Sequence, residues 1–579
     1  MERIKLTFKG LLVFGILNAA AAFVILIYIY RSNMLISNLF IVLGVYVIGI
    51  INKRKKYFAL ERKDRIHSVI LSIILSFALI GNYLFCYPLA KNTSLIDVIL
   101  FLLFTCCIFP VAAAFIRLEK EVLKKDFFEE KRDVDKKHYV KMRLIYIFLT
   151  ELVGIIMLLA FNPAIVSWDA YEVLAEAYGL SMLLEYAGLM YVGIFAVLLR
   201  ICNSIMFLGI TQITIFALLF SRIFIWLEKK SNLRADILVI AYILLLVFPG
   251  NMMMLATLTK DVYYALGIIG LTFCLIRMYM KESQWFLYAE YAVWLFVVYE
   301  IRQSGMIVSI IVAAAAAFLF KNRKIFISTI AAIGLVMVFS IAVLSCDYEE
   351  TPAGLKYVAL YQDLLGVYYS GGKISKEVEE IINIGIGDNL EFADQYTPYW
   401  AYYDEYVYNI DEIEMGYFLK GYIDTFLKNP RIMLRAILCR MDMLWDIRLG
   451  KEGYESWQWK TLMISEEWSS LVPERNVNAL TKIIDCYGKA SLKEPIKSLV
   501  WRQGVWFIIC IASFMSMWKR DKRSIVIYMP LAAFVFSYLV SLGWSHYRYY
   551  WSIELLAVVL CMTWWVDIKI KKKGSVSVE

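Results

Sequence analysis

Residues 162–186, NPAIVSWDAYEVLAEAYGLSMLLEY, separate two long apolar runs and contain no lysine or arginine. The run before them, residues 144–160, has the length and composition of a membrane-crossing helix. The segment is therefore expected to be an outer loop between membrane spans, either catalytic or merely acidic. Its carboxylates are Asp169, Glu172, Glu176 and Glu185.

The composition indicates a polytopic membrane protein. The 579 residues are 61% hydrophobic and 19% charged, with a mean hydropathy of +0.63, whereas soluble domains are closer to half apolar and a quarter charged. The net charge of +9 comes from short basic clusters between apolar runs, which is a topology pattern rather than a nucleic-acid-binding stripe. The ten cysteines and three histidines show no spacing that suits zinc.

Counting apolar runs of roughly 20 residues predicts about fourteen spans. The first run, residues 11–30, is long enough to cross and lacks a signal-peptide cleavage site. Basic clusters occur at residues 52–65, 229–230 and 569–573. Their positions between the predicted spans are consistent with a single orientation of the protein in the membrane, with both termini in the cytoplasm. Residues 187–226 are expected to hold a surface or re-entrant helix followed by one span.

Outward turns are expected at residues 249–261 and 300–305. Residues 346–498 contain no spanning run, so they predict a mainly helical extracytoplasmic domain of roughly 150 residues before the last three spans. Its tail, residues 429–448, predicts an amphipathic helix that starts at Pro430 and rests on the outer membrane surface. The expected fold class is an all-α polytopic membrane bundle.

A few charged residues fall at the outer ends of the predicted spans, where a charge is costly unless it is paired or functional. They are far apart in the sequence, but the predicted topology places them on one face, where they could converge on one cavity. They are Asp169, Lys260, Asp261, Arg302, His546 and Arg548.

Asp169 has two interpretations. Asp169, Glu172 and Glu176 are spaced by three and four residues, which gives one anionic helix face. A carboxylate shielded by Trp168 would have a raised pKa and could act as a general base. The alternative is an ordinary helix start, with Ser167 or Asp169 as the cap.

The basic candidates also have alternatives. Arg302 and Arg548 suit phosphate, because the guanidinium fork matches phosphate oxygens, yet arginines at membrane interfaces are common without any ligand. Lys260 and Asp261 could simply pair with each other or with lipid headgroups. His546 is more often a hydrogen-bonded interfacial residue than an acid or base.

The joint order of these motifs resembles the GT-C superfamily of polyprenyl-phosphate-sugar-dependent membrane glycosyltransferases, in particular its uncharacterised bacterial branch. Besides the acidic loop, the motifs are LTKD (258–261), IRQSG (301–305) and YRYYW (547–551), and the resemblance covers about residues 144–570. Similar proteins often carry a His/Pro-containing segment after the acidic loop, whereas residues 185–191 here read EYAGLMY.

The resemblance implies an inverting transfer of a sugar from a polyprenyl-phosphate donor to a cell-envelope glycan, lipid or protein, at the outer face of the plasma membrane. It implies that Asp169 is the catalytic base. It implies lipid-phosphate contacts from Lys260, Arg302 and Arg548. Asp261, His546 and Glu172 are further possible residues of the site, with no role assigned. Glu176 is interpreted as helix-surface charge. No metal ligand is implied, and the use of a divalent metal is left open.

The resemblance also implies a division of the chain into four parts. These are extra N-terminal helices with a cytoplasmic connector (1–143), a GT-C-like core with the first outer loop at 161–186 (144–345), an extracytoplasmic domain (346–500), and C-terminal helices with a basic tail (501–579).

Three other functions stay open. A flippase or transporter for lipid-linked glycans would need charges through the membrane interior, whereas the charges noted above fall at the outer ends of spans. A glycan polymerase or ligase would depend mainly on Arg and His in outer loops. The missing His/Pro segment keeps a catalytically inactive GT-C-like protein as the third alternative.

Overall fold

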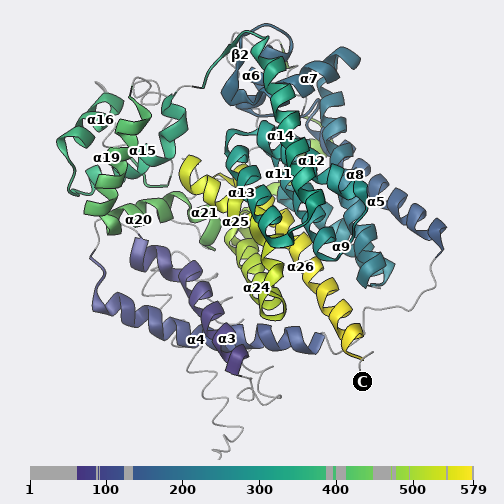
Figure 1. Ribbon diagram of the computed structural model, residues 1–579, viewed down its shortest axis with the longest axis horizontal. Coiled ribbons are helices and arrows are strands. Elements are labelled where there is room, and N and C mark those ends of the chain that lie inside the picture. Colours follow the sequence, from purple (N-terminus) through teal and green to yellow (C-terminus); the bar gives the residue numbers. More distant parts are fainter. Residues whose placement is uncertain are drawn as a thin grey trace, which may run out of the picture.

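The computed structural model of the chain is almost entirely helical (Figure 1). The predicted first span, residues 11–30, lies outside the part that the structure describes. That part comprises residues 62–86, 89, 92–122, 135–231, 233–351, 353–386, 396–399, 413–447, 471–472, 477–493, 496–542 and 546–576.

Nine helices among the described residues are long and apolar enough to cross a membrane, or up to ten if the bent pair α9 (Ala235–Val247) and α10 (Pro249–Ala256) forms one span. The all-α fold with membrane-length helices is thus confirmed, but the count of fourteen is not. The nine are α3 (Arg62–Ser76) continuing into η3 (Phe77–Cys86), α4 (Leu95–Val122), α5 (Lys136–Ala160), α8 (Ile205–Ser231), α11 (Lys260–Tyr279), α13 (Gln303–Phe320), α14 (Arg323–Leu344), η6 (Lys522–Ser524) with α25 (Ile525–Ser541), and α26 (Tyr547–Val576).

Two expected spans are shorter than predicted. The helices α12 (Trp285–Ile301) and α24 (Gly504–Arg520) have 17 residues each, which is short for a crossing of about 20 residues. As expected, the block after the acidic loop holds a short helix, α7 (Leu189–Ile201), followed by the long α8.

Residues 249–261 do not form the open turn that was predicted. Pro249 starts α10, which is bent by 66° from α9, and the strand β3 (Thr257–Leu258) follows. Proline at the first helical position needs no hydrogen bond there, so it can restart a helix directly after Phe248. Burial of the apolar side chains of α10 then holds this second helix inside the protein.

Two short parallel strand pairs connect distant parts of the chain. The strand β1 (Ile165–Val166) pairs with β3, and β2 (Leu183–Leu184) pairs with β4 (Tyr348–Glu349). One residue separates β1 from α6 (Trp168–Ala177), and one separates β3 from α11. Because the two strands run in the same direction and in register, the first turns of α6 and α11 lie next to each other.

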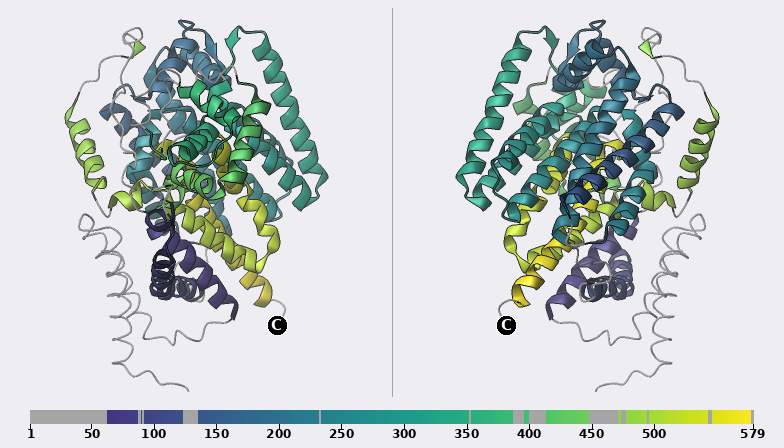
Figure 2. Two further views of the ribbon diagram at one scale, coloured as in Figure 1. Left: turned by 90° about the vertical axis from the view of Figure 1, so that its left-hand side faces the viewer. Right: turned by 90° about the vertical axis from the view of Figure 1, so that its right-hand side faces the viewer.

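The helix α11 is the centre of the bundle, since nearly all of its residues are buried and it packs against α8, α12, α25 and α26. Gly270 permits the close approach of α12, because a Cβ at this position would fall 2.3 Å from the Trp294 ring. By contrast, α3, η3 and α4 pack with one another at one end of the molecule, drawn in purple in Figure 2.

We call α15 (Ala353–Tyr369), α16 (Lys376–Ile386) and α19 (Met415–Lys428) the lateral helices, because they lie to one side of the bundle around a small core of their own (Figure 1). The helices α20 (Pro430–Arg440) and α21 (Asp442–Trp445) lead back into the main core. Two further helices follow, α22 (Ala479–Ser491) and α23 (Ile496–Val500).

The helix predicted from Pro430 is confirmed, but two of its arginines are buried in protein and it ends at Arg440. Arg435 donates to the Leu89 carbonyl and the Thr93 hydroxyl, and Arg440 pairs with a buried carboxylate. Side chains so engaged can be buried without leaving donors unmatched. The prediction of a helix that rests on a membrane surface missed these partners.

Candidate functional site

The five main charged candidates meet where four helices begin. Asp169 is the second residue of α6, Lys260 and Asp261 open α11, Arg302 is the N-cap of α13, and Arg548 is the second residue of α26. Helix N-termini present backbone N–H groups and a positive dipole end, which favours anions in their vicinity.

Four of these side chains form a network in which carboxylates and guanidinium groups alternate. Arg548 Nη1 lies 3.0 Å from Asp169 Oδ2, and Arg548 Nε lies 3.6 Å from Asp261 Oδ2. Arg302 pairs with the other oxygen of Asp261. Lys260 lies beside this network and donates its Nζ to the carbonyl of Tyr186. The cluster therefore holds three cations and two carboxylates, and its formal charge is one positive.

Residues at the helix starts position the two aspartates. Thr259, the N-cap of α11, accepts a hydrogen bond from the Asp261 N–H and donates its hydroxyl to Asp261 Oδ2 at 3.1 Å. Ser167 occupies the N-cap position of α6, but its hydroxyl donates to the Leu258 carbonyl of β3 at 3.0 Å and makes no capping bond. The expected helix start is therefore confirmed in placement, with Ser167 at the N-cap and Asp169 in the first turn, but Ser167 makes no capping bond and Asp169 pairs with Arg548.

Three tyrosines surround the Arg302 guanidinium. The ring centroids of Tyr549, Tyr538 and Tyr264 lie 4.7, 5.2 and 5.9 Å from its central carbon, and Arg548 lies 4.8 Å from the Tyr549 ring. Such cation–π contacts stabilise a desolvated guanidinium by about 2 kcal/mol. Sequence reasoning assigned none of these three tyrosines to the site, although Tyr549 lies within the YRYYW motif (547–551). Tyr264 could have been found from its position one turn after Lys260.

Asp169 is the most exposed side chain of the network, at 33% compared with 2% for Asp261. Burial raises its pKa, but Arg548, Lys260 and Arg302 outweigh this effect and hold the pKa below its ordinary value. The prediction of a raised pKa was therefore wrong, because the nearby cations were left out of it. The side chain of Trp168 lies outside the described part of the structure.

Among the secondary candidates, His546 contacts the backbone of Arg548. Its Nδ1 accepts a hydrogen bond from the Arg548 N–H at 3.2 Å, which places the imidazole at the start of α26. Burial and the positive charge of Arg548 lower the His546 pKa to about 3, so the ring is neutral near pH 7. The imidazole therefore contributes to the start of α26 through its bond with the Arg548 N–H.

The residues after α6 form a strap (residues 183–188) that includes β2 and the short helix η4 (Glu185–Ala187). Glu176 accepts from the Leu184 N–H at 3.2 Å, and Glu172 accepts from the Tyr186 hydroxyl at 3.1 Å. Glu176 is buried, contrary to its interpretation as surface charge, and burial raises its pKa to about 7. Its role is to hold the strap against α6.

The strap continues into the stretch where similar proteins carry a His/Pro segment. Glu185 accepts from the Thr351 N–H at 2.8 Å, next to the β2–β4 pair. Gly188 has φ +88°, and a Cβ at this position would lie 2.8 Å from the Ile301 carbonyl oxygen. This stretch therefore packs its backbone against the end of α12, directly before Arg302.

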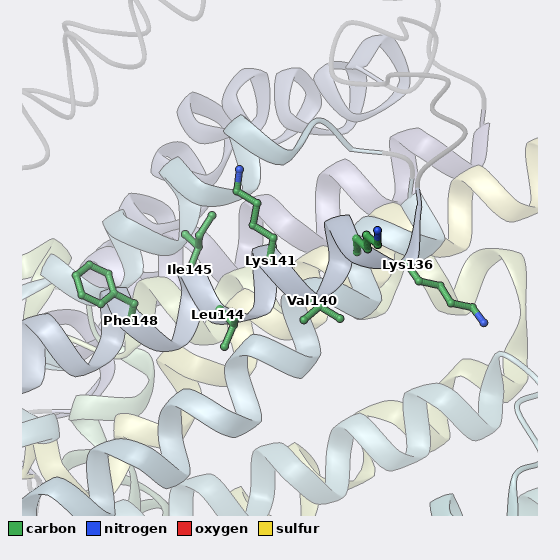
Figure 3. A pocket seen from close by; sticks show the side chains of 7 residues that line it. Lys136, Val140, Lys141, Leu144, Ile145 and Phe148 are labelled. Atoms are coloured by element: carbon green, nitrogen blue, oxygen red, sulfur yellow. The ribbon is translucent and has the colours of Figure 1, made fainter.

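A groove of about 610 Å³ lies elsewhere, along α5, and contains none of these residues (Figure 3). Its lining consists of Lys136, Lys137, Val140, Lys141, Leu144, Ile145 and Phe148. In the described part of the chain, no three or more His, Cys, Asp or Glu side chains are grouped so that they could hold a metal ion.

Comparison of the chain with protein-family models, with curated proteins and with solved structures found no match.

Proposed function

We propose that this chain is an inverting membrane glycosyltransferase that moves a sugar from a polyprenyl-phosphate donor to a cell-envelope acceptor on the outer face of the plasma membrane. One observation carries the proposal. Asp169, Arg548, Asp261 and Arg302 form one charged network with Lys260 beside it, although they come from four separate helices. A charge cluster of this kind in an apolar bundle is costly unless it has a use.

The cationic side of the cluster would hold the donor phosphate. Arg302 and Arg548 offer guanidinium forks that match phosphate oxygens, and Lys260 adds a point charge. The excess of one positive charge suits a phosphodiester, which carries one negative charge. Placement at helix N-termini adds to the attraction of an anion.

Asp169 would act on the acceptor. Its lowered pKa keeps it ionised at neutral pH, so it can take the proton from an acceptor hydroxyl. The acceptor oxygen then attacks the anomeric carbon while the bond from that carbon to the phosphate oxygen breaks. The phosphate leaves with the electron pair, and the cations stabilise its charge. Attack opposite to the leaving group inverts the anomeric configuration.

Donor binding would also activate the base. A carboxylate paired with Arg548 at 3.0 Å is a weak base, because the pair stabilises the ionised form. A donor phosphate that engages Arg548 competes with Asp169 for the same guanidinium. Loss of this pairing raises the pKa of Asp169 toward its ordinary range. The carboxylate is then a stronger base toward the acceptor hydroxyl.

The catalytically inactive GT-C-like protein is the second candidate, and the same ion pair favours it, because a permanently paired Asp169 could not act as a base. An experiment in cells distinguishes the active transferase from the inactive protein. We expect mass spectrometry of cell-envelope glycans from a deletion strain to show a missing sugar that wild-type chain restores and Asp169→Asn does not, at equal membrane insertion. Restoration by Asp169→Asn would contradict the proposed base, and Asp236→Asn, at an exposed carboxylate that pairs with Arg234, serves as the matched control.

A further inference from the structure

Arg440, the last residue of α20, is a fully buried arginine. It binds Asp363 of α15 with two parallel hydrogen bonds, Nε to Oδ1 at 3.0 Å and Nη2 to Oδ2 at 2.9 Å. Asp363, which is also fully buried, accepts a third bond from the Tyr422 hydroxyl of α19 at 3.1 Å. The pair therefore ties α20 to two of the lateral helices.

The same guanidinium closes the C-terminal end of α25. Nη2 donates to the Leu539 carbonyl at 3.0 Å, and Nη1 donates to the carbonyls of Leu542 and, at 3.5 Å, of Tyr538. The last carbonyls of a helix have no partner within it and attract a cation. Arg440 thus fixes the position of the last turn of α25.

That last turn carries one of the tyrosines around Arg302. The Tyr538 ring lies 5.2 Å from the Arg302 guanidinium and contacts Tyr550 edge-on at 5.5 Å. Tyr550 follows Arg548 by two residues on α26. A shift of the end of α25 would therefore reach both arginines of the cluster.

We propose that Arg440 is a positioning residue: through the last turn of α25 and Tyr538, it sets the position of Arg302. The lateral helices are then part of how the cluster is built. A buried ion pair is often no more stabilising than apolar side chains of similar volume, so the presence of this pair favours a role in arrangement over one in stability. The consequence for lipid binding rests on the proposed function, whereas the positioning itself does not.

Hydrogen exchange of the purified full chain tests the positioning without any ligand. The double variant Arg440→Met/Asp363→Leu removes both charges together and leaves none unpaired. Arg435→Met is the matched control, because Arg435 is a buried arginine of the same helix that binds Leu89 and Thr93 instead of α25.

We expect the double variant to lose protection in residues 537–542 and also in residues 298–304, and the control to change neither. Loosening of 537–542 alone would overturn the coupling to Arg302, as would no change in either segment.

Binding of undecaprenyl monophosphate in detergent micelles tests the consequence. We expect the double variant to bind about 30-fold more weakly than wild type, the loss that corresponds to a desolvated cation–π contact of about 2 kcal/mol. The Arg435→Met control should bind as wild type does. Equal binding by the double variant would overturn the role of Arg440 in the lipid site. Failure of the wild-type chain to bind would count against the proposed function, and the exchange result would still decide the positioning.

Discussion

At the scale of single residues, the contact between Asp169 and Arg548 has two consequences. It keeps the carboxylate ionised, because Arg548 and Lys260 outweigh the effect of burial on its pKa. Since the pKa is lowered in the folded chain, the pair contributes stability above the ordinary pKa of an aspartate. That stability is lost as the pH falls through the lowered value.

The proposed release of Asp169 by the donor predicts a difference between two pH profiles. The profile of kcat/KM reports the free enzyme, in which Asp169 is paired, and that of kcat reports the complex. We therefore expect the acidic limb of kcat at a higher pH than that of kcat/KM for the donor. Coincident limbs, measured by transfer rates between pH 3 and 8, would contradict the competition for Arg548.

Replacing Arg548 removes the fork that would hold phosphate and that pairs with Asp169. We expect Arg548→Ala to raise the donor KM by about 30-fold, corresponding to about 2 kcal/mol for a charge-assisted hydrogen bond. Arg548→Lys should recover part of the loss, because it restores the charge without the fork. The control is Arg523→Ala, whose side chain is 71% exposed and pairs with Asp521. An unchanged KM in Arg548→Ala would remove this residue from the site.

At the scale of elements, the strap and the end of α12 set the backbone just before Arg302. Gly188→Ala places a Cβ against the Ile301 carbonyl at a positive φ. We expect it to lower the free energy of unfolding by about 1–2 kcal/mol and to raise the donor KM. Gly193→Ala is the control, since Gly193 lies within α7 and a Cβ there meets nothing within 4 Å. Similar behaviour of the two variants in thermal unfolding and donor KM would show that the strap does not position Arg302.

Glu176 should make the attachment of the strap depend on pH. Its pKa is raised by burial from 4.5 to about 7, so the folded chain holds this proton more tightly than the unfolded chain. Stability is then lost as the pH rises from 4.5 to about 7 and stays constant above that range. Glu176→Gln keeps an oxygen that can accept from Leu184 but removes the titration.

We expect thermal unfolding midpoints at pH 5 and pH 8 to differ less in Glu176→Gln than in wild type, with the variant gaining stability at pH 8. A wild-type difference that persists unchanged in the variant would assign the pH dependence to other groups. Glu185→Gln, in which the side chain can still accept from Thr351, is the parallel control.

At the scale of the whole molecule, the length of an apolar run located helices such as α5, because such a run depends on local composition alone. The grouping of Asp169, Lys260 and Arg302 was predicted from topology, because the predicted spans place all three residues at the same end of the bundle. The contacts that complete the cluster, such as Tyr538 on Arg302, link residues far apart in sequence. The length of an apolar run contains no information on which distant residues contact each other.

The same limit explains two errors. The buried arginines of α20 look like the polar face of an interfacial helix until their partners on other helices are known. The pKa of Asp169 was assigned the wrong direction because burial was considered without the three cations that the fold brings to it. In both cases a charge was judged without its tertiary partners.

Sugar transfer by the purified full chain in liposomes tests the proposed function most directly. The donors are a panel of labelled polyprenyl-phosphate sugars, and the acceptor is envelope glycan. We expect wild type to release polyprenyl phosphate and to label the acceptor with at least one donor. We expect Asp169→Asn to transfer sugar about 100-fold or more slowly at unchanged folding, while Asp236→Asn retains most activity. Transfer by Asp169→Asn at the wild-type rate, or no transfer by wild type with any donor of the panel, would contradict the proposed function.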